Sequence, residues 1–357
     1  MSDIVDTFCE LVRIDSESGN EEAVIAHLSK LFEQELNAEC TRDEYGNLIA
    51  RVAGRNSTKS EPIMLGAHAD TVKPGIGIEP VVKDGVIRSA GETILGADDK
   101  AGIAEIFEAV RTAERRPPVE IVITRSEEIG LLGAKNLDLS VLKSELGFIL
   151  DGEEPDTIVI GGPTHVSLDI DITGKAAHAG MEPERGISAI RVAAQAIASM
   201  PEGRLDEETT ANVGTIHGGM IRNGVPEKVK IQAECRSLDD DKCMRQSQTM
   251  QNAFKSAADR AGATIDINEN IEYAASKLPE DSPGIGLARS AISAAGFDPK
   301  TLVITGGTDA LVLTGRGLPS VVMGYGGGGA HTTGEYIEVA VLRRAAGIVQ
   351  QLLYAAA

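Results

Sequence analysis

Histidines and carboxylates follow several apolar runs of this sequence, at positions where predicted strands end. They are His68 and Asp70 in "GAHADTV", Asp98 in "LGADDK", Glu127 and Glu128 in "RSEEIG", Asp151 in "ILDGEE" and His331 in "GGAHTTGEY". Active sites of open α/β sheets lie at the carboxyl ends of their strands, so we expect these side chains to gather at one edge of a sheet. Carboxylates gathered in this way repel one another and raise one another's pKa, and bound cations relieve that repulsion.

Imidazole and carboxylate ligands without thiolates are typical of zinc or a similar divalent ion. Two such ions lying ~3.5–4 Å apart share a bridging carboxylate, and Asp98 is the candidate for that bridge. Each residue also has a simpler interpretation. Asp98 and Asp99 suit a helix N-terminus, a single histidine is commonly structural, and the Glu127–Glu128 pair could form a solvated corner. The hypothesis of a metal centre therefore depends on the whole set of residues.

The composition is that of a globular protein large enough for two domains, or for one domain with a large insertion. The chain has 357 residues, of which 42% are hydrophobic and 25% are charged. Its net charge of −20 repels nucleic acid and anionic membranes, so neither is an expected partner.

The cysteines and the N-terminal stretch favour a cytoplasmic protein. The four cysteines include no Cys-x-x-Cys pair, so we interpret them as reduced thiols rather than as disulfides or a sulfur metal site. The stretch "MSDIVDTFCELVRIDS" is typical of an amphipathic helix and not of a signal peptide. No run approaches the ~20 apolar residues that a membrane span needs.

Two styles of periodicity divide the chain. In residues 1–162 and 276–357, short apolar strands alternate with helical patterns, which predicts an α/β domain with a largely buried sheet. Residues 163–275 instead contain half-exposed strands and two helices in the order β-α-β-β-α-β, which predicts a small α+β sandwich. We therefore expect a discontinuous α/β domain with an α+β domain inserted into it.

Seven motifs make the sequence similar to the family of zinc exopeptidases that includes peptidase T, carboxypeptidase G and succinyl-diaminopimelate desuccinylase. They are, in order, "HADTV", "LGADDKAGIAEI", "EEIGLLGAK", "LDGEE", "GKAAHAG", "GGTDA" and "HTTGEY". The sequence most resembles the peptidase T-like proteins. The resemblance implies a mixed-sheet catalytic domain with a dinuclear zinc centre and an inserted lid and dimerisation domain. It also implies a cytoplasmic homodimer that pairs through the inserted domain and hydrolyses short peptides as a tripeptidase or aminopeptidase.

The resemblance assigns the metal ligands residue by residue. His68 and Asp151 would bind one metal ion, and Glu128 and His331 would bind the other. Asp98 would bridge the two ions. Zinc is the expected metal, with cobalt or manganese as alternatives.

The resemblance also assigns residues around the metals. Asp70, two residues after His68 on the same face of a strand, would hold the imidazole. Glu127 would be the general base, taking a proton from the attacking water and passing it to the leaving amine. In the inserted domain His178 would donate to the tetrahedral oxyanion, in its own subunit or in its partner, and Asn212 could assist it. Arg236 would grip a substrate carboxylate.

One departure from the family pattern bears on the substrate. Peptidase T has an arginine directly before "GGTD", where this sequence has Thr305. An amidohydrolase or deacylase of N-acyl amino acids, or a carboxypeptidase with the same metal centre, therefore stays open as an alternative. A non-catalytic binding protein on the same scaffold is disfavoured, because every expected ligand and Glu127 are present.

The glycine run before His331 allows a second alternative. "GYGGGG" matches the G-x-G-x-x-G pattern of dinucleotide-binding proteins, but too few residues follow it to complete a β-α-β unit. We instead expect these glycines to allow close approach of the backbone to the substrate.

Overall fold

A computed structural model describes residues 3–357, which divide into two compact units. The first unit contains the chain up to Gly161 together with Lys277–Val303 and Thr308–Ala357, and the second contains Gly162–Ser276 and Ile304–Gly307. The sequence placed residues 304–307 in the discontinuous domain, whereas the structure groups them with the second unit. The reason is packing, because a Cβ atom at Gly307 would overlap the ring of Tyr273.

The first unit is built on a mixed sheet with the strand order β1-β2-β6-β3-β7-β16-β8-β14, and β15 pairs with β8. Its strands are β1 (Glu39–Arg42), β2 (Leu48–Val52), β3 (Ile63–His68), β6 (Val119–Thr124), β7 (Gly147–Gly152), β8 (Thr157–Gly162), β14 (Ser276–Lys277), β15 (Lys300–Val303) and β16 (Ser320–Gly324). At its centre β6, β3, β7 and β16 are parallel neighbours. These strands are almost entirely buried, as expected for a sheet that is covered on both faces.

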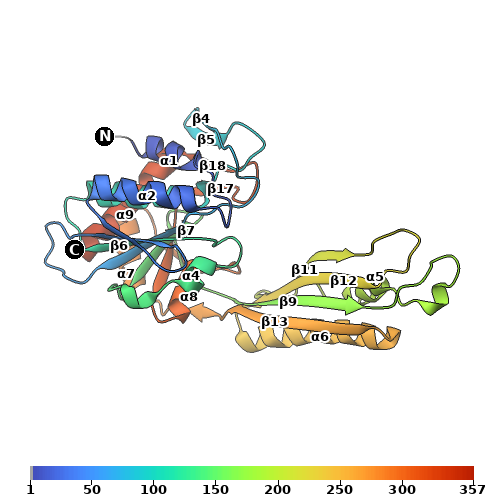
Figure 1. Ribbon diagram of the computed structural model, residues 1–357. Coiled ribbons are helices and arrows are strands. Elements are labelled where there is room, and N and C mark those ends of the chain that lie inside the picture. The colour runs from blue at the N-terminus through green and yellow to red at the C-terminus, as the bar shows by residue number, and fades with distance from the viewer. Residues whose placement is uncertain (1–2) are drawn as a thin grey trace. The chain divides into compact units, whose positions relative to one another are not determined.

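Helices cover both faces of this sheet (Figure 1). Five of them share one hydrophobic core with the sheet, namely α1 (Ile4–Val12), α2 (Glu22–Leu36), α3 (Ala97–Thr112), α7 (Pro283–Ala294) and α9 (Val339–Ala356). On the other face lie α4 (Leu132–Asn136) and α8 (Asp309–Gly315), and α8 contacts β7 and β16. A 3-10 turn, Leu139–Val141, follows α4. The predicted amphipathic helix at the start of the chain is α1.

A smaller antiparallel sheet of the first unit has the strand order β17-β18-β5-β4. Its strands are β4 (Pro80–Lys83), β5 (Val86–Ser89), β17 (Gly327–Gly328) and β18 (Tyr336–Glu338). Because β5 precedes α3 and β18 follows His331, their pairing brings the chain before α3 close to the loop that carries this histidine.

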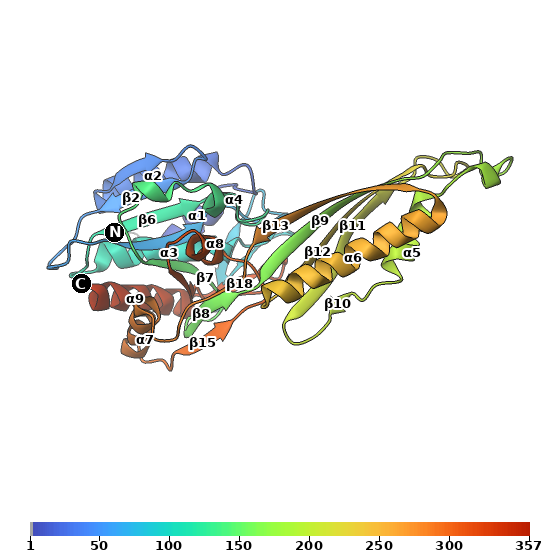
Figure 2. The ribbon, with the colours of Figure 1, turned by 90° about the horizontal axis from the view of Figure 1, so that it is seen from below.

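The second unit is an antiparallel sheet, ordered β10-β11-β12-β9-β13, with α5 and α6 packed on one face (Figure 2). Its elements are β9 (Thr164–Thr173), a 3-10 turn (Pro183–Arg185), α5 (Ala189–Ile197), β10 (Gly203–Arg204), β11 (Thr209–Gly218), β12 (Lys228–Ser237), α6 (Asp240–Ala261) and β13 (Thr264–Tyr273). Alternate residues of β9 are buried against the helices and the residues between them face outward. The predicted order β-α-β-β-α-β is confirmed, with β10 as a short additional strand.

Local signals determine where the long helix of the second unit begins and ends. The side chain of Asp239 accepts the backbone N–H of Lys242 at the start of α6, and Gly262, with a φ of 69°, ends it. The expected fold class, an α/β domain with an inserted α+β domain, is confirmed. Within residues 3–357, no helix is both long enough and apolar enough to span a membrane.

Candidate metal centre and active site

Parallel pairing of β6, β3 and β7 brings three of the predicted site segments to one edge of the main sheet. His68 is the last residue of β3 and is paired with Thr124, the last residue of β6. Glu127 and Glu128 follow β6 directly, and Asp151 lies near the carboxyl end of β7. The carboxyl ends of parallel neighbours meet at the same edge, which is where open α/β sheets bind their ligands.

Asp98 joins these residues and His331 into one cluster. Its Oδ1 atom lies 3.1 Å from Nε2 of His68, and its Oδ2 atom lies 3.3 Å from Nε2 of His331. Nε2 of His68 is also 3.9 Å from Oδ1 of Asp151, and Nε2 of His331 is 2.9 Å from Oε1 of Glu128. The two oxygens of Asp98 therefore face different imidazoles, and one further carboxylate lies near the Nε2 atom of each, Asp151 at His68 and Glu128 at His331.

Asp98 and Asp99 lie at the N-terminal end of α3, but their side chains do not cap the helix. Both residues lie outside the helical range of backbone angles. Oδ2 of Asp99 accepts the backbone N–H of His68 at 3.1 Å, and among the described residues its Oδ1 has no hydrogen-bond partner. Ligand atoms of His68, Asp99 and Asp151 lie within 4.8 Å of one another, so Asp99 is a candidate ligand that the sequence did not single out. Of these two aspartates it is Asp98 that directs one oxygen at each histidine.

The carboxylates of the cluster lie against the two imidazoles. Asp98, Glu128 and Asp151 each form an ion pair with at least one of them. Ligand atoms of His68, Asp98 and Glu128 also lie within 4.8 Å of one another. This donor set of imidazole nitrogens and carboxylate oxygens fits divalent ions such as zinc.

The pKa values of the cluster reflect this crowding. Burial and then the neighbouring carboxylate of Asp98 raise the pKa of Asp151 well above its ordinary value. Contacts with Asp98 and Glu128 raise the pKa of His331 to about 10. Burial alone would lower the pKa of His68, but the surrounding carboxylates outweigh it and raise this pKa well above its ordinary value. Metal binding to such a cluster releases protons, because the cation replaces them as the compensating charge.

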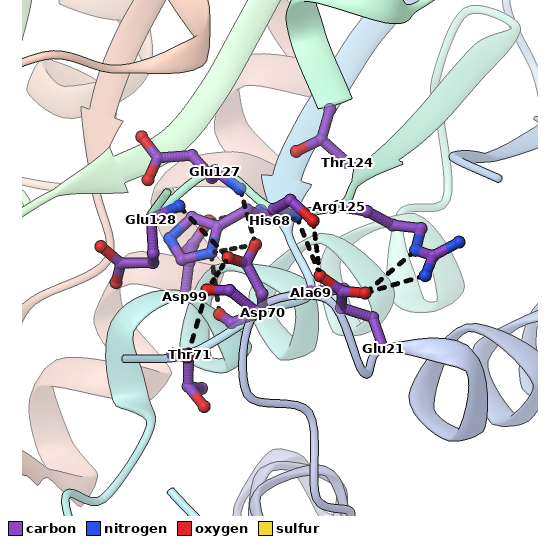
Figure 3. A network of polar contacts seen from close by, with 12 residues as sticks. Glu21, His68, Ala69, Asp70, Thr71, Asp99, Thr124, Arg125, Glu127 and Glu128 are labelled. Carbon is purple, nitrogen blue, oxygen red and sulfur yellow. Dashed lines mark hydrogen bonds and ion pairs between the residues drawn. The ribbon is translucent and has the colours of Figure 1, made fainter. Parts of the chain in front are cut away.

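Asp70 organises the segment that carries Glu127 and Glu128 (Figure 3). Its Oδ1 atom accepts the backbone N–H of Glu127 at 2.9 Å, and its Oδ2 atom accepts the N–H of Glu128 at 3.2 Å and the hydroxyl of Ser18 at 2.7 Å. From the sequence we expected the Asp70 carboxylate to hold the imidazole of His68. In the structure Nδ1 of His68 bonds to the backbone carbonyl of Asp70 at 2.9 Å, and the carboxylate lies farther away, at 3.5 Å.

Glu127 has an environment that suits a proton acceptor. The residue is 9% exposed, and no hydrogen bond or ion pair of its carboxylate is found within residues 3–357. Burial raises the pKa of Glu127 well above its ordinary value, and the negative charge of Asp151 adds to this effect while His68 opposes it. A carboxylate with a raised pKa is a stronger base, as general base catalysis requires.

His178 belongs to the second unit, and no partner of its Nε2 atom is found among the described residues. Its side chain is exposed, and its Nδ1 atom accepts the backbone N–H groups of Gly180 at 3.2 Å and Met181 at 3.1 Å. Because Nδ1 acts as an acceptor, the proton of the neutral ring is on Nε2. This nitrogen is available as a hydrogen-bond donor.

Arg236, also in the second unit, is already paired with a carboxylate of its own strand. Its Nε and Nη2 atoms lie 3.2 and 3.0 Å from Oε1 and Oε2 of Glu234. Nε2 of His165 lies 2.8 Å from Oε2 of the same residue, and these contacts lower the pKa of Glu234 to about 2. Asn212 of β11 is exposed and stands opposite Glu234 in the sheet. A substrate carboxylate would have to share Arg236 with Glu234 or displace it.

Glu335 is a residue of the site that the sequence did not single out. It is buried, and its Oε2 atom accepts the backbone N–H groups of Leu95 at 2.8 Å and Gly96 at 2.7 Å. Its Oε1 atom accepts the N–H of Asp98 at 3.0 Å. Glu335 therefore fixes the loop that presents Asp98. The available signal was its place four residues after His331, in "HTTGEY".

The glycine run before His331 serves packing of the chain against itself. A Cβ atom at Gly324 would overlap the backbone carbonyl of Glu154, and one at Gly326 would overlap the side chain of Val341. Gly326 also has a φ of 85°, which L residues rarely adopt. These contacts explain the glycines at 324 and 326, while close approach of the backbone to a substrate stays a prediction.

Comparisons with known proteins give matches over both units of the chain. The model of the M20 peptidase dimerisation domain matches residues 161–262, and that of peptidase family M28 matches residues 47–157. The protein YqjE of Bacillus subtilis is 38% identical over 99% of this chain and 98% of its own length. Among solved structures, a tripeptidase from Staphylococcus aureus matches with a TM-score of 0.91 and 34% identity, and the aminopeptidase PepT from Bacillus cereus with 0.86 and 39%. Both matches cover 99% of this chain and 98% of the other.

Proposed function

The chain belongs to the peptidase T-like M20 family of metal-dependent peptidases, and we propose that it cleaves short peptides from their free amino end at a centre of two zinc ions. Similarity to a tripeptidase and to an aminopeptidase, each over 99% of the chain, supports this substrate class. One observation carries the proposal of two ions. The two oxygens of the Asp98 carboxylate face different histidines, one His68 and the other His331.

In this proposal each ion has one histidine and one carboxylate of its own. His68 and Asp151 would hold the first ion, His331 and Glu128 would hold the second, and Asp98 would contribute to both. Zinc suits these nitrogen and oxygen donors, and cobalt or manganese are alternatives. When bound, such ions lower the pKa of water to roughly neutral and polarise the carbonyl of the scissile bond.

Glu127 is the proposed general base. Its backbone is fixed by Asp70 and its carboxylate is buried and without a hydrogen-bond partner among the described residues, so it is free to take a proton from the attacking water. It then gives this proton to the leaving amine. Asp70 accepts the backbone N–H groups of Glu127 and Glu128 and so would keep both residues next to the metal ligands.

The second unit supplies the proposed substrate contacts. The free Nε2–H of His178 donates to the oxyanion of the tetrahedral intermediate, with Asn212 assisting, and Arg236 binds the terminal carboxylate of the peptide. The match to a peptidase dimerisation domain supports a homodimer that forms through this unit. The free cysteines agree with the reducing environment of the cytoplasm.

A second candidate is an amidohydrolase or deacylase of N-acyl amino acids, or a carboxypeptidase, with the same metal centre. One observation favours it. Thr305 stands where the peptidase T pattern has an arginine, so the substrate contacts of the peptidase T pattern are incomplete in this chain.

The deciding experiment measures hydrolysis of a panel of free tripeptides and of their N-acetylated counterparts, after zinc loading and again with a chelator. We expect cleavage of the free tripeptides only, lost with the chelator. Glu127→Gln should bind zinc as the wild type does and hydrolyse at least about 10²-fold more slowly, whereas Glu92→Gln, at an exposed position of the same unit, should behave as the wild type. Cleavage restricted to the acetylated compounds would replace the proposal by the second candidate, and no cleavage at all would refute both.

A further inference from the structure

The loop between α1 and α2, residues 13–21, is packed against the chain that forms the metal centre. The hydroxyl of Ser16 donates to the backbone carbonyl of Ala69 at 2.8 Å, and the hydroxyl of Ser18 donates to Oδ2 of Asp70 at 2.7 Å. Neither family model that matches the chain extends to this loop.

We propose that Glu21, the last residue of this loop, is a positioning residue that holds Ser126 in the backbone conformation from which Glu127 enters the site. Glu21 has no exposed surface. Its Oε1 atom accepts the backbone N–H of Ser126 at 3.1 Å, the hydroxyl of Ser126 at 2.9 Å and the N–H of Gly19 at 2.7 Å. Its Oε2 atom accepts from Nε and Nη2 of Arg125 at 3.1 and 2.9 Å (Figure 3).

These contacts make Glu21 unsuited to bind a metal ion or a substrate. Both oxygens are taken by donors, and the Arg125 guanidinium compensates the buried charge. Arg125 is itself held, because its backbone N–H donates to Oδ1 of Asn47 at 3.1 Å. Glu21 can therefore act on the reaction only through the geometry of residues 125–126.

The backbone of Ser126 needs such a support. Its φ of 55° lies in the left-handed region, which residues other than glycine rarely adopt. From this turn the next two backbone N–H groups, those of Glu127 and Glu128, donate to the carboxylate of Asp70. The backbone N–H groups of residues 126–128 thus donate to two buried carboxylates, those of Glu21 and Asp70. Both carboxylates fix the backbone from which the side chain of Glu127 extends.

The direct test is Glu21→Gln, compared with Glu22→Gln. Glutamine keeps the volume of Glu21 but turns one acceptor oxygen into a donor, which then faces the donors of Ser126 or Arg125. Glu22 is its matched control, since it pairs with Arg42 at 2.7 Å on the surface. We expect Glu21→Gln to lower kcat on a free tripeptide by about 10²-fold with KM changed less than about threefold, and Glu22→Gln to leave both unchanged.

A second pair of variants separates positioning from folding. Ser126→Gly adopts a positive φ without strain, whereas Ser126→Ala keeps the strain and loses the hydroxyl contact with Glu21. We expect kcat of Ser126→Ala to lie below that of Ser126→Gly. When Ser126→Gly is combined with Glu21→Gln, we expect kcat to be about tenfold higher than in Glu21→Gln alone. The reverse order of the two Ser126 variants, or wild-type kcat in a folded Glu21→Gln protein, would overturn the proposal.

The proposal rests on the role of Glu127 in the proposed function, so one measurement is independent of activity. Hydrogen exchange of the amides of residues 126–128 is followed in the metal-free protein without substrate. Faster exchange at these amides in Glu21→Gln, but not in Glu22→Gln, supports the positioning role even if no peptide is cleaved. Unchanged exchange overturns it even if the wild type proves to be a tripeptidase.

Discussion

Glu105 lies in α3 with no exposed surface, and neither oxygen of its carboxyl group has a hydrogen-bond partner within residues 3–357. Burial raises the pKa of Glu105 well above its ordinary value of 4.5. The same helix presents Asp98 to the metal centre at its N-terminal end. We predict that Glu105→Gln, which keeps the size of the side chain, makes the protein more stable than the wild type at neutral pH.

The sign follows from proton linkage. The folded protein keeps the proton of Glu105 to a higher pH than the unfolded chain does, so the unfolded chain binds fewer protons between the two pKa values. The free energy of unfolding of the wild type therefore falls as the pH rises through this window, by about 1.4 kcal/mol per pH unit. Below the ordinary pKa both states hold the proton and the contribution is constant. Glutamine has no proton to release, so the variant lacks this slope.

The assay is urea unfolding of both proteins in the metal-free form at several pH values from about 5 upward, so that titrations other than that of Glu105 cancel in the difference. We expect the free energy of unfolding of the variant to exceed that of the wild type by about 1.4 kcal/mol more for each pH unit, until the pKa of Glu105 in the folded protein is reached. Glu108→Gln, on the same helix, removes the carboxylate that pairs with Arg111 and should show no such gain. Parallel stability curves for the wild type and Glu105→Gln would refute the reasoning.

Two further predictions concern the loop that presents Asp98 and the binding of a substrate carboxylate by Arg236. Glu335→Gln replaces an acceptor of the N–H groups of Leu95, Gly96 and Asp98 by a partial donor. It should weaken zinc binding by about 10–100-fold in a competition titration with a chelator, and wild-type affinity would show that Asp98 is held by other contacts. Arg236→Lys loses the two-pronged geometry of guanidinium and should raise KM for free tripeptides at least about tenfold, with kcat little changed and C-terminally amidated peptides unaffected. An unchanged KM would remove Arg236 from the proposed substrate site.

Much of the fold and part of the site follow from local patterns. The apolar runs that became β3, β6 and β7 end where polar residues begin, and the parallel pairing of such strands aligns their carboxyl ends. The meeting of His68, Glu128 and Asp151 could therefore be predicted. The change from continuous runs of apolar residues to an alternation of apolar and polar residues likewise indicated the second unit. This alternation arises because helices cover only one face of its sheet.

Other features were decided by contacts between segments far apart in sequence. Glu335 and Asp98 are 237 residues apart, and Glu21 and Ser126 are 105 residues apart, yet each pair is joined by a hydrogen bond to a backbone N–H group. Such a bond depends on two loops meeting in space and leaves no periodic pattern in either segment. The glycines at 324 and 326 belong to the same class, since what requires them is the backbone at Glu154 and the side chain of Val341.

The sequence by itself determined which residue types end the strands, and hence that carboxylates and imidazoles converge at one edge of a sheet. Only the tertiary structure decided what each carboxylate does there. Asp98 and Asp99 are chemically identical neighbours, but one directs its oxygens at two histidines and the other bonds to the backbone of His68. The difference arises from the non-helical backbone at the N-terminal end of α3, which Glu335 holds from the far end of the chain.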